Sequence, residues 1–190
     1  MSETRSTQTR DDAWRLLTEW TQSESLQKHA LAVEAAMRGQ ARRAGADADL
    51  WGLTGLLHDL DYERFPDPSD HPMRGVEALR AEGYPEEMLR AILGHAAYTG
   101  VPRETPLARA LFAVDELCGF LTAVAYVRPD RRLASVEVSS VRKKLRDKAF
   151  ARSVSRDDIA QGAAELGLDL DVHIANVLAD LQTAAPDLGL

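Results

Sequence analysis

The stretch that most restricts the fold of this chain is LWGLTGLLHDL, at residues 50–60, which would be apolar on nearly every side of a helix. Such a helix needs other helices around it, so it predicts a central, buried helix over about residues 49–60. The segment at residues 25–44 could cover it, because its apolar residues recur every three or four positions. No segment shows the sustained alternation typical of a strand. We therefore expect an all-α protein.

Further helices follow from the same periodicity, with Gly and Pro as stop signals. We expect them over residues 10–21, 72–83, 85–99, 106–127, 141–152, 156–166 and 170–184. Asp70 and Ser155 are the expected N-caps of the helices that follow them. Residues 1–9 are polar and are expected to form a flexible tail, and residues 10–190 a single compact domain.

Charge and cysteine usage exclude several classes of protein. Lys and Arg total 23 against 30 acidic residues, for a net charge of −7, which disfavours general nucleic-acid binding. The one cysteine, Cys118, excludes an internal disulfide and fits a reducing compartment. The N-terminus lacks the apolar stretch of a signal peptide, and the longest uncharged apolar run, residues 117–127, is too short to cross a bilayer. We expect a cytoplasmic protein without membrane binding.

Two aspartates stand where apolar residues would be expected. Asp59 follows His58 at the end of the most apolar helix, and a buried carboxylate is costly unless it is paired or bound to a metal. The alternative is that Asp59 faces water at the helix end. Asp115 lies in the middle of the helix over residues 106–127, beside mostly small residues that leave room next to the carboxylate. Here the alternatives are that Glu116 points inward instead, or that Asp115 belongs to a solvated or Arg-paired stripe.

Four of the five histidines also lie on or beside expected apolar faces. His29 and His95 each lie in line with apolar residues, although either could be an ordinary core histidine. His71 stands at a helix start, where a surface role is an equal alternative. The fifth histidine, His173, borders the apolar face of the last helix, and we interpret it as structural or exposed. Together, imidazoles and carboxylates in one buried cluster would suit a divalent transition metal.

The order of these residues resembles the HD superfamily of metal-dependent phosphohydrolases. The resemblance rests on HALAVEAAM at residues 29–37, LTGLLHDLDYE at 53–63, GHAAYTG at 94–100 and ALFAVDEL at 110–117. It covers roughly residues 25–125 and implies an HD core of about five helices there. The remaining helices, over about residues 130–185, would form a C-terminal extension.

The resemblance also implies a set of metal ligands. One divalent ion would be bound by four residues: His29, His58, Asp59 and Asp115. Some branches of the family place two more histidines between the last two ligands and hold a second ion, with the doublet Asp as a bridge. His71 and His95 occupy those places here. The expected cofactor is thus one or two ions of Mn, Fe, Co, Ni, Mg or Zn.

The activity implied is hydrolysis of a small phosphate ester, a nucleotide or a related phosphomonoester, by metal-activated water. Asp61 or Glu63 could orient that water next to Asp59, although neither stands at the spacing common among nucleotidase branches. No motif typical of cyclic-dinucleotide phosphodiesterases is present.

The charge of such a substrate would need basic partners. The segment VRKKLRDKAFAR, at residues 141–152, contains Lys144 and Lys148, which share one helical face and are candidate substrate-binding residues. Arg103 lies close in sequence to a proposed ligand and is a further candidate. The alternative for each of the three is a solvated surface charge.

Two other functions remain open. A diiron oxygenase would use the same six-ligand pattern with iron and would consume oxygen. A non-enzymatic module would bind a nucleotide without turnover or hold a purely structural metal. The sequence does not fix the oligomeric state.

Overall fold

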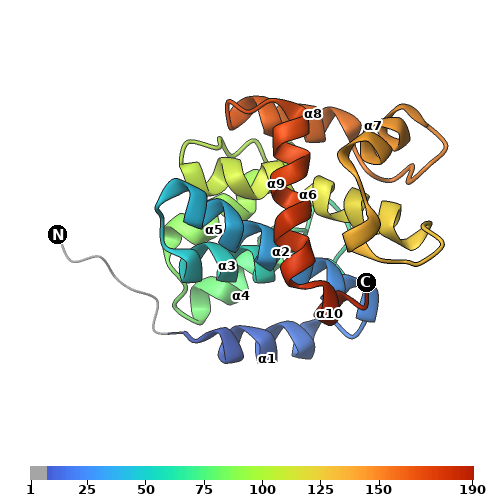
Figure 1. Cartoon of the computed structure of the whole chain (residues 1–190). Helices are drawn as coiled ribbons and strands as arrows, with labels where there is room; N and C mark the ends of the chain where they lie inside the picture. Colours follow the sequence, from blue (N-terminus) through green and yellow to red (C-terminus); the bar gives the residue numbers. More distant parts are fainter. Residues whose placement is uncertain (1–7) are drawn as a thin grey trace.

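The computed structural model describes residues 8–190, and every regular element in that range is a helix, which confirms the all-α class (Figure 1). The α-helices are α1 (Arg10–Trp20), α2 (Glu24–Ala44), α3 (Ala48–Leu57), α4 (Met73–Ala81), α5 (Glu86–His95), α6 (Pro106–Tyr126), α7 (Val138–Arg146), α8 (Arg156–Glu165), α9 (Leu170–Thr183) and α10 (Ala185–Leu188). Two short 3₁₀ helices are η1 (Ala97–Thr99) and η2 (Leu133–Ser135). Among these helices, none has the length and apolar character needed to cross a membrane.

Most of the expected N-terminal tail, residues 1–7, lies outside the described residues. Thr9 is described and caps α1: its side chain accepts from the Asp12 backbone N–H, and Asp12 accepts from the Thr9 backbone in return. This reciprocal arrangement satisfies two of the N–H groups that a helix start leaves without partners. Thr9 thus belongs to the start of α1.

Helix α3 occupies the centre, as its apolar sequence predicted. Every residue from 51 to 57 is buried, and the helix contacts α1, α2, α5 and α6. Gly55 allows a close backbone contact with α2, because a Cβ there would lie 2.8 Å from the backbone oxygen of Val33. The central helix therefore fixes where the ends of its neighbours can lie.

Helix α6 is the second buried element. It packs on α2, α3 and α5, and also contacts α7, α8 and α9 from the C-terminal part of the chain. Figure 1 shows α9 lying across α2 and α6, with α8 at one end of α9. Helix α6 thus lies between the first helices and the C-terminal helices.

Two helices end earlier than the periodicity indicated. Helix α3 ends at Leu57, and residues 58–64 form turns, so His58 and Asp59 follow the helix directly. Helix α5 ends at His95, because Ala96 is extended at ψ 105°, and η1 follows in place of the rest of the expected helix. Both changes place a histidine at a helix end.

Two local expectations were wrong. Asp70 does not cap α4, which starts at Met73 with Pro72 before it and no side-chain cap; Asp70 instead accepts a hydrogen bond from Arg74 Nε at 3.0 Å. The expected helix over residues 141–152 is α7, which starts and ends earlier. It ends because the Asp147 carboxylate accepts the Ala149 N–H at 3.0 Å, a local turn that competes with helical hydrogen bonding.

The contact between α8 and α6 gives a prediction for stability. A Cβ on Gly162 of α8 would lie 2.5 Å from Ala113 Cα of α6, so Gly162→Ala must push the two helices apart. We expect the free energy of unfolding to fall by about 1–3 kcal/mol, measured by urea denaturation. Gly119→Ala is the matched control, since nothing lies within 4 Å of its Cβ position, and it should be neutral or stabilise by up to about 1 kcal/mol. Equal stabilities of the two variants would contradict this close packing.

Candidate metal centre

Three helices and two turns bring together six side chains that the sequence marked as candidate ligands. His29 lies in the first turns of α2, His95 is the last residue of α5, and Asp115 is in the middle of α6. His58 and Asp59 follow α3, and His71 lies in the turn before α4. Three overlapping groups among them offer ligand atoms within 4.8 Å of one another: His29, His58 and Asp59; His58, His95 and Asp115; Asp59, His71 and His95.

One side of this cluster is built around Asp115. His29 Nε2 lies 3.0 Å from Asp115 Oδ1, and His58 Nε2 lies 3.4 Å from the same oxygen. His58 Nε2 is also 3.5 Å from Asp59 Oδ2. Two imidazole nitrogens and two carboxylates therefore converge at this point, and nitrogen and oxygen ligands of this kind could hold a divalent transition metal.

The other side of the cluster is built around Asp59 Oδ1. His71 Nε2 and His95 Nε2 each lie 3.4 Å from this oxygen. The two oxygens of Asp59 thus face different sets of imidazoles. A carboxylate in this position could contact two ions at once.

Each of three imidazoles is held through its other ring nitrogen. His58 Nδ1 lies 2.8 Å from the Gly55 carbonyl oxygen, and His95 Nδ1 contacts the carbonyl of Ile92. His71 Nδ1 lies 2.7 Å from the Asp61 carboxylate. In each case Nδ1–H donates, which directs Nε2 at the cluster, as in histidines that bind metals. His58 Nε2 is buried and has no hydrogen-bond partner within residues 8–190, so a bound cation would satisfy it.

Electrostatics keep the two central carboxylates ionised. Burial by itself would raise the pKa of Asp59, but the neighbouring His58 and His95 outweigh it and hold that pKa below its usual range. Asp115 shows the same balance, with a pKa well below the ordinary value because of His58 and His29. Burial also opposes the charged form of His95, yet the Asp59 carboxylate raises the pKa of His95 to about 9. Both aspartates are therefore charged and able to bind a cation at neutral pH.

The structure gives Asp61 and Glu63 partners outside the cluster. Asp61 is fully buried, and its two oxygens contact His71 Nδ1 and the Gly75 backbone N–H, each at 2.7 Å. Asp61 therefore orients His71. Glu63 accepts the backbone N–H groups of Gln22 and Ser23, which link α1 to α2. The expectation that one of these carboxylates orients a water has no support from these contacts.

The three candidate substrate-binding residues also lie among other partners. Arg103 forms an ion pair with Glu165 at 2.6 Å and lies 3.7 Å above the ring of Phe112. Lys144 Nζ lies 4.6 Å from the ring of Phe150 on the turn after α7, and Lys148 is exposed on the same turn. No hydrogen bond or ion pair between described residues joins these three side chains to the cluster.

On α6, the alternative between Asp115 and Glu116 is resolved by the contacts. Asp115 faces the histidines, and Glu116 accepts the Ser155 backbone N–H at 3.1 Å. Burial and the nearby Asp115 raise the pKa of Glu116 to about 7. Glu116 thus links α6 to the start of α8.

Sequence reasoning missed two tyrosines beside the cluster. The Tyr62 and His71 ring centroids are 5.2 Å apart, and the Tyr98 hydroxyl donates to the His71 carbonyl at 3.1 Å. Their positions in the sequence could have indicated them, since Tyr62 stands three residues after Asp59 and Tyr98 stands three residues after His95.

His173 is structural, one of the two alternatives that the sequence left open. It is fully buried on α9, where Nε2–H donates to the Ala113 carbonyl at 2.8 Å, and its Nδ1 has no partner among the described residues. Burial lowers the pKa of His173 below its usual value, and Arg43 adds to this effect.

This histidine predicts a pH effect on stability. Below about pH 6.5 the unfolded chain binds a proton at His173 that the folded chain resists, so folding loses free energy as the pH falls. We expect the free energy of unfolding to drop less between pH 7 and pH 5 in His173→Gln than in the unmodified protein, measured by urea denaturation at each pH. Equal drops in the two proteins would show that His173 does not carry this effect.

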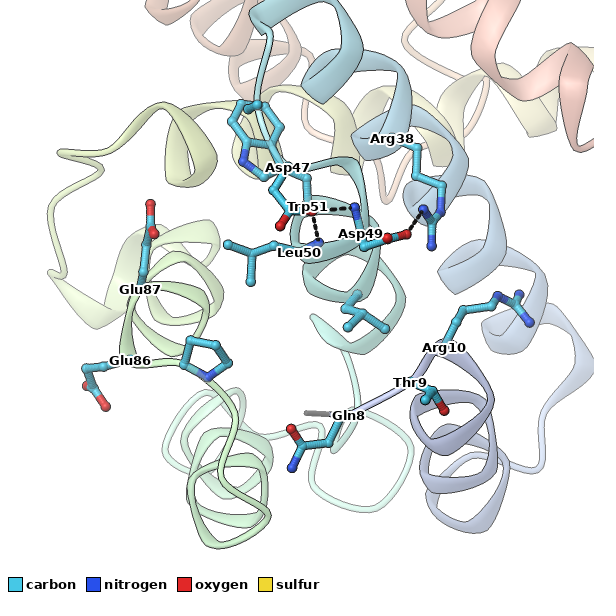
Figure 2. A pocket seen from close by; sticks show the side chains of 13 residues that line it. Gln8, Thr9, Arg10, Arg38, Asp47, Asp49, Leu50, Trp51, Glu86 and Glu87 are labelled. Atoms are coloured by element: carbon cyan, nitrogen blue, oxygen red, sulfur yellow. Dashed lines mark hydrogen bonds and ion pairs between the residues drawn. The ribbon is translucent and has the colours of Figure 1, made fainter. Parts of the chain in front are cut away.

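A groove of about 1230 Å³ lies away from the cluster, between the starts of α1, α3 and α5 (Figure 2). Figure 2 shows two of its polar side chains already paired: Asp47 accepts the N–H groups of Asp49 and Leu50, and Arg38 bonds to Asp49. No histidine lines it. None of the groups of possible metal ligands among the described residues lines this groove.

Comparison with known proteins gives one match. The sequence model of the HD domain matches residues 26–119, a range that contains all six side chains of the cluster. No curated protein and no solved structure matches the chain.

Proposed function

Because the chain belongs to the HD-domain family, we propose that it is a metal-dependent phosphohydrolase that acts on a small phosphate ester. The observation that carries this proposal is the position of Asp59, whose two oxygens face imidazole nitrogens on two sides, at 3.4–3.5 Å. His29, His58, Asp59 and Asp115 would hold one divalent ion, and Asp59, His71 and His95 a second. Imidazole and carboxylate together suit Mn, Fe, Co, Ni or Zn, and Mg is also a candidate.

A divalent ion in such a site lowers the pKa of a bound water toward neutrality and polarises a phosphoryl oxygen. The protein itself orients the histidines and leaves space for a substrate next to them. Asp61 fixes the orientation of His71, and the backbone carbonyls of Gly55 and Ile92 fix His58 and His95. Gly119, one turn from Asp115 on α6, leaves open space, since nothing lies within 4 Å of its Cβ position.

The number of bound ions decides what His95 can do. With two ions, His95 would be a ligand and neutral. With one ion, on the Asp115 side, His95 would not be a ligand, and its imidazolium form could donate a proton to the leaving-group oxygen. Metal content per chain distinguishes the two arrangements.

The test is phosphate release from nucleoside monophosphates, sugar phosphates and aryl phosphates, with Mn, Co, Ni, Fe, Mg or Zn supplied in turn. We expect release that depends on the metal and stops with a chelator. Protein that holds metal but releases no phosphate from any of these esters would overturn the proposal.

A diiron oxygenase is a second candidate, favoured by the six nitrogen- and oxygen-bearing ligands around a carboxylate between two groups of histidines. Iron that copurifies with the protein, together with oxygen uptake on addition of a substrate, would identify this function. A closed structural site is disfavoured, because the side chains of Asp59 and Asp115 are 23% and 20% exposed and so can be reached from solvent.

A further inference from the structure

Two exposed aromatic rings stand beside the Asp59, His71 and His95 group. Tyr62 is 41% exposed and Tyr98 is 54% exposed, although both lie within contact of a buried histidine. The Tyr62 ring meets the His71 ring at 79°, an edge contact that leaves ring surface open to solvent. The Tyr98 hydroxyl is held by the His71 carbonyl, which limits the movement of its ring. Both rings thus lie next to the place where a substrate phosphate would bind.

The positive charges closest in sequence to the proposed ligands are already engaged. Lys28 forms an ion pair with Glu24 at 2.7 Å, and Arg74 one with Asp70 at 3.0 Å. Arg64 donates to backbone carbonyls at the end of α1. Among the described residues, these contacts leave few unpaired positive charges near the cluster to bind a second or third phosphate group. A substrate with one phosphate and a neutral remainder fits this surface best.

We propose that Tyr62 and Tyr98 bind a planar aromatic group of the substrate, so that the preferred substrate is a monophosphate ester that carries a nucleobase or an aryl ring. The inference rests on the proposed function, because it takes the phosphate to bind at the metal cluster. Stacking on an exposed tyrosine covers apolar surface of both rings and tolerates different ring types. A sugar phosphate without a ring of this kind gains nothing from the two tyrosines.

Binding of phosphonates, which the protein cannot hydrolyse, tests this inference independently of catalysis. Phenylphosphonate and methylphosphonate differ by the ring alone, and neither has an ester bond to hydrolyse. We expect metal-loaded protein to bind phenylphosphonate about 5- to 100-fold more tightly, measured by titration calorimetry. The preference should disappear in the double variant Tyr62→Leu/Tyr98→Leu and persist in Tyr62→Phe/Tyr98→Phe, which keeps both rings. Tyr126→Leu is the control, because Tyr126 is also 45% exposed but stands at the far end of α6 from Asp115.

Turnover then distinguishes the two kinds of ring. A lower KM for nucleoside 5′-monophosphates than for ribose 5-phosphate would identify a nucleobase as the preferred ring. If the KM is lower only for phenyl phosphate relative to methyl phosphate, the preferred substrate is an aryl ester. Equal affinity for the two phosphonates, no binding of either, or a preference that survives in the double Leu variant would overturn the inference. Preferential phosphonate binding without phosphate release from any ester would support the aromatic surface and contradict only the proposed hydrolysis.

Discussion

Asp59→Ala should remove bound metal and abolish phosphate release while the chain stays helical. Asp59 offers one carboxylate oxygen to each proposed metal-binding group: Oδ2 lies near His58, and Oδ1 lies near His71 and His95. We expect phosphate release to fall by more than about 100-fold, beyond the loss typical of a residue that only orients a ligand. Metal analysis, circular dichroism and phosphate release on the same preparation measure the three effects.

Asp70→Ala is the matched control for this variant. Asp70 lies in the turn next to His71, but its carboxylate bonds to Arg74 on the surface and not to the cluster. It should keep its full metal content and activity. An Asp59→Ala protein that retained as much metal as the control would show that the cluster is not the metal site.

Asp61→Asn should weaken binding of one ion and spare the other. Asp61 is buried behind His71, accepts its Nδ1–H at 2.7 Å and contacts no other histidine of the cluster. Asparagine keeps an oxygen for the Gly75 N–H but loses the negative charge that fixes the imidazole tautomer. We expect the affinity for the ion at Asp59, His71 and His95 to fall about 10- to 100-fold. The ion at His29, His58 and Asp115 should bind as before, so a metal titration would show one weakened equivalent.

Glu63→Gln serves as its control, because Glu63 stands two residues away and accepts hydrogen bonds from the link between α1 and α2, not from the cluster. Its metal titration should match that of the unmodified protein. Loss of both ions in Asp61→Asn, or of neither, would contradict the arrangement with two metal groups.

The parts of the fold that the sequence predicted are those governed by local burial. Apolar periodicity predicted the helices, and the unbroken apolar stretch at residues 50–60 predicted the central position of α3. The histidines and aspartates were found by the same reasoning, since polar groups on apolar faces need a partner. The resemblance to the HD superfamily is confirmed by the match at residues 26–119.

What the sequence did not predict depends on contacts between distant residues. Asp61 acts on His71 and Gly75, 10 and 14 positions along the chain, and no helical spacing brings these three residues together. Arg103 was a candidate for substrate binding on its sequence position, but its partner Glu165 is 62 residues away. The end of α7 was missed for a different reason, because a single carboxylate at Asp147 competes with the helix there. Sequence periodicity does not report such side-chain competition.

Helices α8 and α9, which lie outside the residues matched by the family model, both contact Ala113, two positions before Asp115. Gly162 of α8 lies against Ala113 Cα, and His173 of α9 donates to the Ala113 carbonyl. The cluster residues all fall within residues 26–119. The α6 segment that carries Asp115 nevertheless packs against Gly162 and His173, which lie beyond that range. The end of the family match at residue 119 is therefore not a boundary in the packing of the helices. Grafting residues 26–119 into another protein would transfer every proposed ligand without the support that holds α6 in place.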